Sequence, residues 1–323
     1  MRSLVLKGKN ELLSFQEIEN PLPASNELVV HLKAAALNHR DVFIQKGLYA
    51  GIIYPMVLGS DGAGVLDNGK EVIICPSIFW GEDSNYQGKN HQILGLPMYG
   101  TFAEKIKVPA EYIFPKPKHL SFEQAAAIPL AGLTAFRALF TKCKVKAGNR
   151  VLVTGIGGGV ALFALQFAVA TGCEVWVSSS SEEKIARAVA MGAKGGVNYK
   201  TEGWGKEFNK TTGGFDAIID GASGGGVAEL VKVCKSGARI CFYGGTAGLI
   251  TGVSPQIIFY KQIILLGSTM GTTSEFKKML SFINKYKIIP VIDEIFPLSE
   301  GNKAMERMDA GQQFGKLVLS IGL

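Results

Sequence analysis

The residues that point most directly to chemistry form a run of glycines near the middle of the chain. The run reads Thr154-Gly-Ile-Gly-Gly-Gly-Val-Ala161 and separates a β-rich apolar stretch, 150–154, from a longer apolar stretch, 160–171. Glycines allow a tight turn and a close approach to a pyrophosphate, and a following helix adds N–H donors and the positive end of its dipole. The run therefore predicts a dinucleotide-binding turn. The alternative is an ordinary tight turn in an unrelated α/β sheet.

The positions of this turn have distinct expected parts. Gly155 permits the tight turn, and Gly157 and Gly158 let the backbone approach the pyrophosphate. Gly159 and Ala161 allow the helix to pack closely on the sheet. The candidate cofactor contacts in the turn are Gly155, Gly157, Gly158, Gly159 and Val160.

A serine cluster at the end of the next apolar stretch indicates which nicotinamide cofactor binds. An NAD site expects an acidic residue about 20 residues beyond the glycine fingerprint, where it bonds the ribose 2′-hydroxyl. This chain has Ser178-Ser-Ser-Ser181 there, followed by two glutamates and Lys184. The serines Ser178, Ser179 and Ser180 can hydrogen-bond a 2′-phosphate and Lys184 can add charge, so we predict NADPH. The alternative is that Ser180 or Ser181 only caps the following helix.

The stretches around the glycine turn alternate between strand and helix patterns, which predicts βαβ units and a doubly wound parallel sheet. The expected strands are 150–154, 174–178, 196–199, 216–220, 238–242 and 263–266, and the expected helices are 160–171, 182–191 and 227–234. Phe242-Tyr-Gly-Gly245 follows one of these strands, and the carboxyl edge of such a sheet is where ligands bind. Tyr243 and Gly244 are therefore further candidate cofactor contacts.

The first 120 residues or so have a different character. Short strands punctuated by Gly, Pro and Asn predict a sandwich or barrel-like domain, with a long excursion over 77–100. Ser121-Phe-Glu-Gln124 has the form of a capping box and predicts a helix start. Helices over 274–286 and 299–309 and a strand over 315–319 are expected to return the chain to this first domain.

Length and composition limit the classes of function. At roughly 100–200 residues per domain, 323 residues argue for two domains, and 47% hydrophobic with 19% charged residues is an ordinary soluble profile. The formal net charge is +7, but no dense basic run supports a nucleic-acid or membrane partner. The five cysteines are scattered and the four histidines have no metal-ligand spacing, so we expect no metal and a reducing, cytoplasmic location.

Beyond these local patterns, the whole chain resembles the medium-chain dehydrogenase/reductase superfamily, and most of all its zinc-free quinone oxidoreductase and enone reductase branch. The resemblance implies a GroES-like, β-rich catalytic domain over 1–122, a Rossmann domain over 123–268 and a return segment over 269–323. It also implies a homodimer or homotetramer paired near residues 263–268. The segments that carry the family resemblance are 35–41 (Ala-Ala-Leu-Asn-His-Arg-Asp), 47–49 (Gly-Leu-Tyr), 58–64 (Leu-Gly-Ser-Asp-Gly-Ala-Gly), 100–104 (Gly-Thr-Phe-Ala-Glu), 126–135, the glycine turn and 315–316 (Gly-Lys).

The resemblance also bears on zinc. Zinc-dependent relatives place a cysteine where this chain has Asn38, carry Gly-His-Glu where it has Gly59-Ser60-Asp61, and have a third ligand near Leu130. Catalytic zinc needs about three protein ligands and an open position. None of the three ligands is present here, so we expect no zinc.

Without a Lewis acid, hydride transfer favours an acceptor that delocalises negative charge, such as a quinone, an enone or a 2-alkenal. By resemblance, Asn38 and Tyr49 face the nicotinamide, where Tyr49 donates to the substrate oxygen and Asn38 holds the carboxamide or that oxygen. Asp41 orients Arg40 or a backbone amide. The alternatives are that Tyr49 only lines the pocket and that Asp41 is a structural cap.

Three further cofactor contacts come from the resemblance. Thr134 matches the residue at the nicotinamide ribose-phosphate region, and Tyr199 matches the tyrosine near the 2′-phosphate and adenine. Lys316 is expected to reach the cofactor or the cleft. The prediction is an NADPH-dependent reductase of quinones or activated alkenes; the alternatives are an NADPH-binding redox sensor without turnover and a zinc-type alcohol dehydrogenase.

Overall fold

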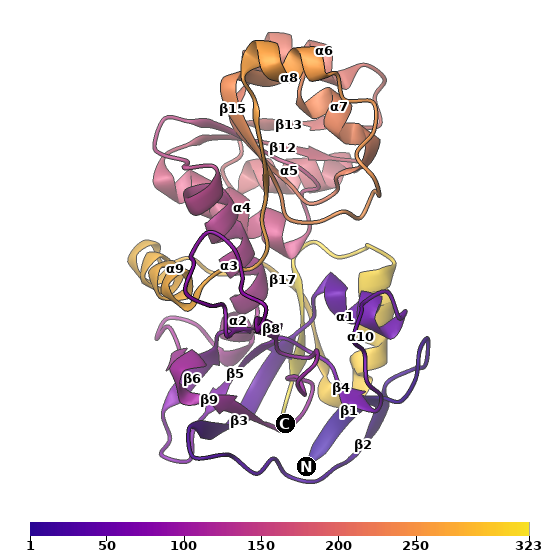
Figure 1. Ribbon diagram of the computed structural model, residues 1–323, viewed down its shortest axis with the longest axis vertical. Coiled ribbons are helices and arrows are strands. Elements are labelled where there is room, and N and C mark those ends of the chain that lie inside the picture. The colour runs from indigo at the N-terminus through magenta and orange to yellow at the C-terminus, as the bar shows by residue number, and fades with distance from the viewer. Residues whose placement is uncertain (323) are drawn as a thin grey trace. The chain divides into compact units, whose positions relative to one another are not determined.

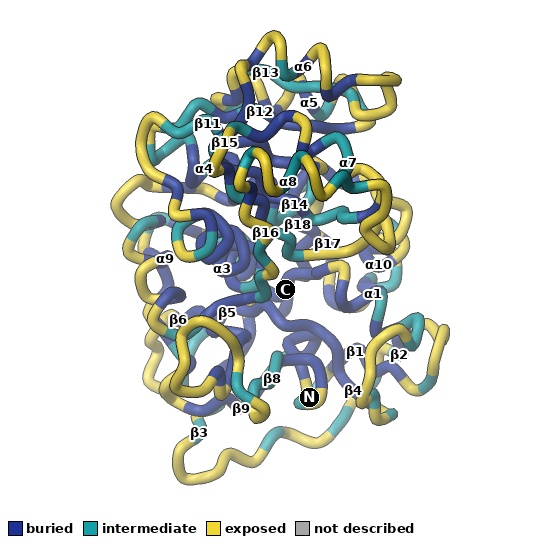
Figure 2. Tube along the Cα trace, turned by 45° about the horizontal axis from the view of Figure 1, so that its top comes forward, coloured by how far each residue is buried: buried dark blue, intermediate teal, exposed yellow. Residues whose placement is uncertain are grey.

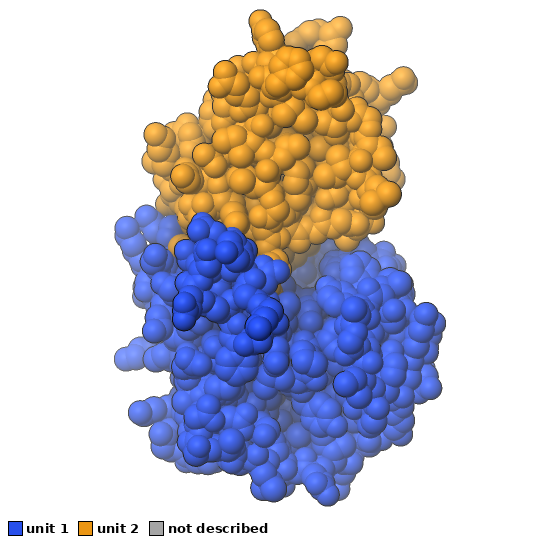
Figure 3. All heavy atoms as spheres, in the orientation of Figure 1, with its two compact units in different colours: residues 1–133, 271–323 blue, residues 134–270 orange. Residues whose placement is uncertain are grey.

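The computed structural model describes residues 1–322, and within them the chain divides into two compact units (Figure 3). Unit 1 consists of Met1–Leu133 with Gly271–Leu323, and unit 2 of Thr134–Met270. No helix among the described residues is both long and apolar enough to cross a membrane.

Unit 1 is built on a mainly antiparallel sheet in the order β10-β6-β5-β3-β18-β17, with β9 also paired to β3 (Figure 1). The carboxyl-terminal strand β18 lies antiparallel to β3, where Val318 pairs with Ala36, so the end of the chain completes the sheet begun near its start. The strands are β3 (Glu27–Ala36), β5 (Asp61–Val65), β6 (Glu71–Ile74), β9 (Lys105–Pro109), β10 (Ile113–Pro115), β17 (Ile292–Pro297) and β18 (Lys316–Ser320).

Smaller sheets and several helices complete unit 1. Its second sheet has the order β2-β1-β4, and β7 pairs with β8 inside the long excursion. The strands are β1 (Arg2–Leu6), β2 (Ser14–Glu17), β4 (Met56–Val57), β7 (Ser77–Ile78) and β8 (Gln92–Ile93). The helices are α1 (His39–Gln45), α2 (Phe122–Ala126), α9 (Thr273–Tyr286) and α10 (Gly301–Asp309); α3 (Pro129–Phe136) runs from the end of the first segment into unit 2.

The capping box predicted at the start of α2 is confirmed. Ser121 Oγ accepts a hydrogen bond from the Gln124 amide at 3.2 Å, and Gln124 Oε1 accepts one from the Ser121 amide at 3.0 Å. Two amide groups that a helix start would leave without partners are thereby satisfied.

Unit 2 holds a parallel sheet in the order β13-β12-β11-β14-β15-β16, which confirms the predicted doubly wound arrangement (Figure 1). The order reverses at β11, whose carboxyl end leads into the glycine turn. The strands are β11 (Arg150–Val153), β12 (Glu174–Ser179), β13 (Gly195–Asn198), β14 (Phe215–Asp220), β15 (Cys234–Phe242) and β16 (Ile264–Gly267). The helices are α4 (Gly159–Thr171), α5 (Glu182–Ala190), α6 (Trp204–Thr212), α7 (Val227–Leu230) and α8 (Pro255–Lys261).

Several elements of unit 2 differ from expectation. The predicted helix over 227–234 is wrong beyond Leu230, because Cys234 already pairs with Phe215 as the first residue of β15. Helix α6 was not predicted, although Trp204 and Phe208, one helical turn apart, are both buried in the core of this unit. Helix α8 has no buried residue and shows yellow and teal in Figure 2.

Unit 1 also contains a parallel strand pair that was not predicted from the sequence. Strand β17, which follows α9 in the chain, lies parallel to β18.

Candidate active site

The glycine turn has the backbone geometry that its residue types predict. Gly155 has φ +61° and Gly157 φ +119°, and the second value lies in a region that only glycine adopts without strain. Gly158 is the N-cap of α4, and Gly159 is its first residue. The amide of Ile156 donates to the carbonyl of Ser178 at 2.9 Å, which ties the turn to the end of β12. The turn thus places glycine backbone at a helix start, as phosphate binding requires.

Lys184 lies against this turn. A Cβ built on Gly157 would come within 2.9 Å of Lys184 Cδ and 3.5 Å of its Nζ. The lysine belongs to α5, whose start is capped by Ser181 Oγ accepting the Lys184 amide at 3.3 Å. A flexible cation is therefore held beside the backbone that is expected to face the phosphates.

The predicted phosphate-reading serines are not equally exposed. Ser178 and Ser179 are buried within β12, and Ser179 Oγ accepts the amide of Ser181 at 3.2 Å. Ser181 serves as the helix cap, which was the alternative considered for this cluster. Ser180 is exposed, so it is the serine of the cluster whose hydroxyl is most open to a ligand.

Other predicted cofactor contacts lie at the carboxyl ends of the strands or on α3. Tyr199 follows β13, is 46% exposed, and donates its amide to the Ser179 carbonyl at 3.1 Å. The amide of Tyr243 donates to the Asp220 carbonyl at 3.0 Å, and the carbonyl of Gly244 accepts from Ser223 Oγ at 2.7 Å. Thr134 is buried in α3. Sequence reasoning missed Asp220, whose position at the end of a strand pattern was the available signal.

In unit 1 a buried ammonium group organises the second set of predicted residues. Lys316 Nζ donates to the Leu37 carbonyl at 2.6 Å, to Asn38 Oδ1 at 2.7 Å and to Asp61 Oδ2 at 3.0 Å. Asn38 Nδ2 also donates to Asp61 Oδ2 at 2.9 Å, and the amide of Leu130 donates to Asp61 Oδ1 at 2.8 Å. Within unit 1, Lys316 thus donates its hydrogen bonds to Leu37, Asn38 and Asp61, and the expectation that it reaches the cofactor or the cleft stays a prediction.

Asp41 holds backbone amides. Its Oδ2 accepts the Asn38 amide at 2.8 Å, which caps α1, and its Oδ1 accepts the Gly59 amide at 3.3 Å. Complete burial raises the pKa of Asp41 to about 6, although the charge of Arg40 opposes the shift. This arrangement corresponds to the backbone-amide and capping roles considered for Asp41.

Tyr49 is 40% exposed, and the Arg40 guanidinium lies 5.6 Å from its ring centroid, within cation–π range. The same guanidinium donates to Ser60 Oγ at 2.7 Å and to the Leu94 carbonyl at 2.9 Å. Arg40 therefore links Tyr49 to the Ser60 loop and to the end of the long excursion.

The positions where zinc-dependent relatives carry ligands do come together, but their chemistry does not fit zinc. Asn38, Asp61 and Leu130 are joined by the hydrogen bonds above. The site contains a carboxamide, a backbone amide and one carboxylate, which is already paired with the Lys316 ammonium, and none of these groups is a thiolate or imidazole donor. Over residues 1–322, moreover, no group of three or more His, Cys, Asp or Glu side chains could hold a metal.

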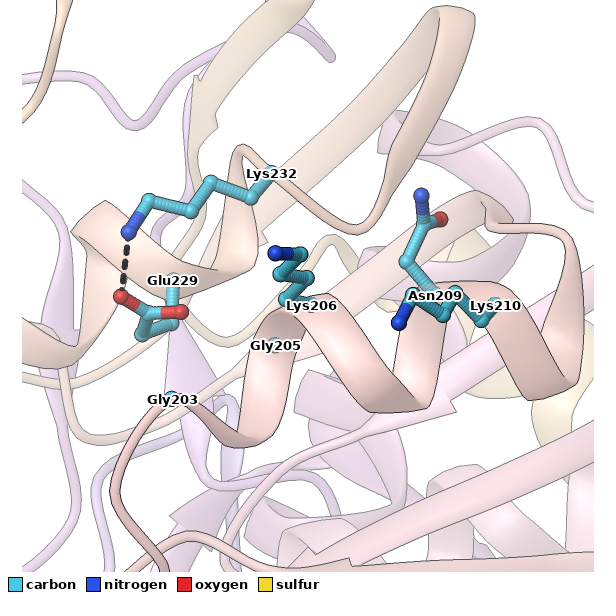
Figure 4. A pocket seen from close by; sticks show the side chains of 7 residues that line it. All are labelled: Gly203, Gly205, Lys206, Asn209, Lys210, Glu229 and Lys232. Carbon is cyan, nitrogen blue, oxygen red and sulfur yellow. Dashed lines mark hydrogen bonds and ion pairs between the residues drawn. The ribbon is translucent and has the colours of Figure 1, made fainter.

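A pocket in unit 2 does not belong to this site. Its lining shares no residue with the predicted cofactor contacts, and its Lys232 pairs with Glu229 at 2.5 Å (Figure 4). Lys210, on the same helix as Lys206, pairs with Glu207. The lining residues are Gly203, Gly205, Lys206, Asn209, Lys210, Glu229 and Lys232.

Comparison with known proteins identifies two matching domain families. Residues 24–118 match the alcohol dehydrogenase GroES-like domain, and residues 159–285 match the zinc-binding dehydrogenase family. A zinc-type alcohol dehydrogenase-like protein, YogA, from Leptosphaeria maculans is 38% identical, and the alignment covers 96% of this chain and 94% of that protein.

Solved structures give the same result. A structure titled as an NAD-dependent alcohol dehydrogenase is 36% identical, with a TM-score of 0.94 and full coverage of both chains. The quinone oxidoreductase from Thermus thermophilus, described with its NADPH complex, is 25% identical with a TM-score of 0.83, and the match covers 99% of this chain and 100% of that one. With a GroES-like domain, a Rossmann-like sheet and these relatives, the chain belongs to the medium-chain dehydrogenase/reductase superfamily of NAD(P)-dependent oxidoreductases.

Proposed function

We propose that this protein is an NADPH-dependent reductase of quinones or α,β-unsaturated carbonyl compounds that works without zinc. The observation that carries the proposal is the ammonium of Lys316, bound to Asn38 Oδ1 and Asp61 Oδ2 where zinc-dependent relatives carry ligands. A cation fixed among these groups would repel a divalent metal, and lysine cannot ligate while it is protonated. Reduction then needs an acceptor that does not depend on a Lewis acid.

The proposed chemistry divides between cofactor and protein. NADPH supplies the hydride when bound, and a quinone or enone accepts it with its negative charge spread over a phenolate or enolate. Tyr49 donates a hydrogen bond to the substrate oxygen, where that charge develops. Asn38 retains a second Nδ2–H beyond the one given to Asp61, which is available to the carboxamide or to the same oxygen. Asp41 positions Asn38 through its backbone amide.

The preference for NADPH rests on Lys184 and Ser180. We infer that Lys184, held beside Gly157, supplies charge to a 2′-phosphate, and that the exposed Ser180 adds a hydrogen bond. The remaining proposed cofactor contacts lie along the same sheet edge or on α3. They are Thr134, Gly155, Gly157, Gly158, Gly159, Val160, Tyr199, Tyr243 and Gly244.

We further propose that a second copy of the chain pairs along β16, giving a homodimer, or a homotetramer if the dimers associate again. In the described chain β16 is an edge strand bonded to β15, and its Ile264 and Leu265 are more than a third exposed. Helix α8, just before β16 in the chain, exposes Phe259 at 68% and Tyr260 at 86%. Exposed apolar edges of this kind are pairing surfaces. Light scattering of wild type and of Leu265→Lys tests the pairing: a monomeric wild type would contradict it.

The decisive experiment follows NADPH absorbance with a small quinone and with a small 2-alkenal, alongside matched runs with NADH and a zinc analysis of the purified protein. We expect oxidation that prefers NADPH, survives a zinc chelator, and is faster with one acceptor class. Stoichiometric zinc would favour the zinc-type alcohol dehydrogenase that the name of the 38% identical relative suggests. Tight NADPH binding without turnover of either acceptor would favour the redox sensor.

A further inference from the structure

A buried carboxylate lies at the carboxyl end of the central strand β14 in unit 2, beside the glycine turn. Asp220 is 2% exposed, and its Oδ1 accepts the hydroxyl of Thr154 at 2.5 Å. Its Oδ2 accepts the amide of Ser223 at 2.7 Å. One side chain thus gathers donors from the first residue of the glycine turn and from the loop after β14.

The loop after β14 is in turn tied to the loop after β15. Ser223 Oγ donates to the Gly244 carbonyl at 2.7 Å, and the Tyr243 amide donates to the Asp220 carbonyl. Gly221 leaves room for the ring of Tyr243, because a Cβ there would lie 2.6 Å from its Cζ atom. The ends of β11, β14 and β15 are therefore joined through Asp220 and Ser223.

The backbone of Ser223 shows that these contacts hold an unfavourable conformation. Ser223 has φ +59° and ψ −133°, a combination that costs a non-glycine residue roughly 1–3 kcal/mol and persists only where its surroundings enforce it. Both its amide and its hydroxyl are engaged, the first by Asp220 and the second by Gly244. The geometry of this loop is thus imposed by the carboxylate and its partners.

The charges around the carboxylate are consistent with this role. Burial raises the pKa of Asp220, while the donors from Thr154, Ser223 and Ala222 oppose the shift. The hydroxyl of Tyr243, the first residue after β15, is a titratable group close to Asp220, and its pKa is raised by burial and by the charge of Asp220. The ionised carboxylate accepts both hydrogen bonds, from the Thr154 hydroxyl at Oδ1 and from the Ser223 amide at Oδ2, with neither oxygen occupied by a proton.

We propose that Asp220 is a positioning residue that holds the glycine turn at Thr154 and the loops at Ser223 and Gly244 in one arrangement for the dinucleotide. The inference rests on the proposed cofactor site and deepens it. Asp220 does not itself touch the cofactor in this role; it acts through the backbone that Thr154 and Ser223 carry.

The same strand offers a matched control at its other end. Asp216 of β14 accepts the Arg150 amide at 2.7 Å and pairs with Lys235 at 2.9 Å, so it also joins neighbouring elements of the sheet. It lies at the amino end of the strand, opposite the edge at which a Rossmann sheet binds its ligand. Loss of Asp216 should therefore cost stability without affecting the cofactor.

The test measures NADPH dissociation constants of the full-length chain by fluorescence titration, with urea unfolding of each variant. For Asp220→Ala and for Thr154→Val we expect NADPH binding to be at least about tenfold weaker. The first variant leaves the donors of Thr154 and Ser223 without their acceptor, and the second leaves Asp220 without one of its donors. With a working acceptor, the KM for NADPH should rise while kcat at saturating cofactor stays within about threefold. Thr154→Ser keeps the hydroxyl and should restore binding, and Asp216→Asn should leave it unchanged.

Asp220→Asn is a second variant that keeps the test informative if Asp220→Ala does not fold. Its amide can serve Thr154, whose hydroxyl can turn to accept, while its remaining oxygen keeps the Ser223 amide, so we expect an effect milder than that of Asp220→Ala. Unchanged NADPH binding in Asp220→Ala, or equal weakening in Asp216→Asn, would overturn the inference.

Amide hydrogen exchange separates this inference from the proposed function. Protection of residues 155–158 and 222–223 should fall in Asp220→Ala and persist in Asp216→Asn, whether or not a cofactor is present. If wild type binds neither NADPH nor NADH, the proposed function fails, and the role toward a dinucleotide fails with it. Unchanged exchange in Asp220→Ala, with a wild type that does bind NADPH, would overturn the positioning role alone.

Discussion

The two units each bury a carboxylate close to predicted site residues, Asp61 beside Asn38 and Asp220 beside the glycine turn, but the hydrogen-bond partners of the two carboxylates differ in charge. Asp61 in unit 1 is matched by a buried ammonium, Lys316, and by N–H donors from Asn38 and Leu130. Asp220 in unit 2 is held by neutral donors, the hydroxyl of Thr154 and the amide of Ser223. The first arrangement neutralises the carboxylate inside a closed network, whereas the second leaves a buried acid whose stability depends on hydrogen bonds alone.

Because the two hydrogen-bond networks differ in this way, we expect them to contribute to different properties of the protein. The unit 1 network joins β18 to the loop before α1, so it connects the end of the chain to its beginning, and its loss should appear mainly as loss of stability. The unit 2 network joins loops at a sheet edge, so its loss should appear mainly in ligand affinity. The predictions below test this division.

The largest effect is expected from Lys316→Met. The substitution keeps an unbranched side chain of similar length but leaves Asp61, which is fully buried, without its counter-charge. Removing one partner of a buried ion pair typically costs about 3–5 kcal/mol. The free energy of unfolding from urea denaturation should fall by that amount. Lys46→Met, which removes an exposed ion pair with Asp309, should cost less than about 1 kcal/mol. Equal losses in the two variants would break the comparison.

The second prediction concerns pH. Because the folded-state pKa of Asp41 is raised to about 6 from an ordinary value of 3.8, the folded protein holds a proton that the unfolded chain has released between these values. Stability from this group is therefore present at low pH and is lost as the pH rises through about 6, by about 3 kcal/mol in total. Urea unfolding at intervals from pH 4 to pH 7 measures the change.

The control for this prediction is Asp41→Asn, which cannot titrate. Its stability should decline less than that of wild type over the same pH range, so that the difference between the two proteins shrinks or reverses as the pH rises. Parallel profiles would show that Asp41 is not the group responsible. The Asp220 carboxyl, whose pKa is also raised by burial, should add a decline of the same sign to both proteins.

The third prediction compares two glycines of the same turn. Gly157→Ala should cost about 1–3 kcal/mol of stability, because φ +119° is strained for any side chain, and the new Cβ would push Lys184 off the turn. NADPH binding should weaken in parallel. Gly155→Asn should be nearly neutral in stability, because asparagine tolerates φ +61° and the space there is open. Similar costs at both positions would contradict this account of the turn.

The features that could be predicted from sequence are local. The glycine turn, the alternation of strands and helices around it and the capping box at Ser121 all depend on residues within a few positions of one another. Helix α6 escaped prediction because its sequence is mostly polar, and only Trp204 and Phe208 indicate its buried face.

The buried network of unit 1 could not be predicted in the same way. Lys316 and Asp61 lie 255 residues apart, and they are brought together because β18 and β5 both pair with β3, which a single sequence does not specify. The family resemblance identified Asn38, Asp41 and Lys316 as candidate site residues. It did not predict that Asn38 forms hydrogen bonds with both Asp41 and Lys316. Asp220 lies at the end of a predicted strand, but the sequence does not show that Thr154 and Ser223 donate hydrogen bonds to its carboxylate.

The smallest effect is expected at Lys184, the residue proposed to distinguish NADPH from NADH at the sheet edge of unit 2. If Lys184 supplies charge to a 2′-phosphate, Lys184→Met should weaken NADPH binding by about tenfold, the free energy of one charge-assisted hydrogen bond, and NADH binding by much less. Lys200→Met, at an exposed position on the loop after β13, serves as the control for a general loss of positive charge. Fluorescence titrations at two salt concentrations measure both cofactors, and the loss for NADPH in Lys184→Met should shrink at high salt. Equal losses for NADPH and NADH would assign Lys184 to the pyrophosphate instead, and the selectivity would then lie with Ser180 and its neighbours.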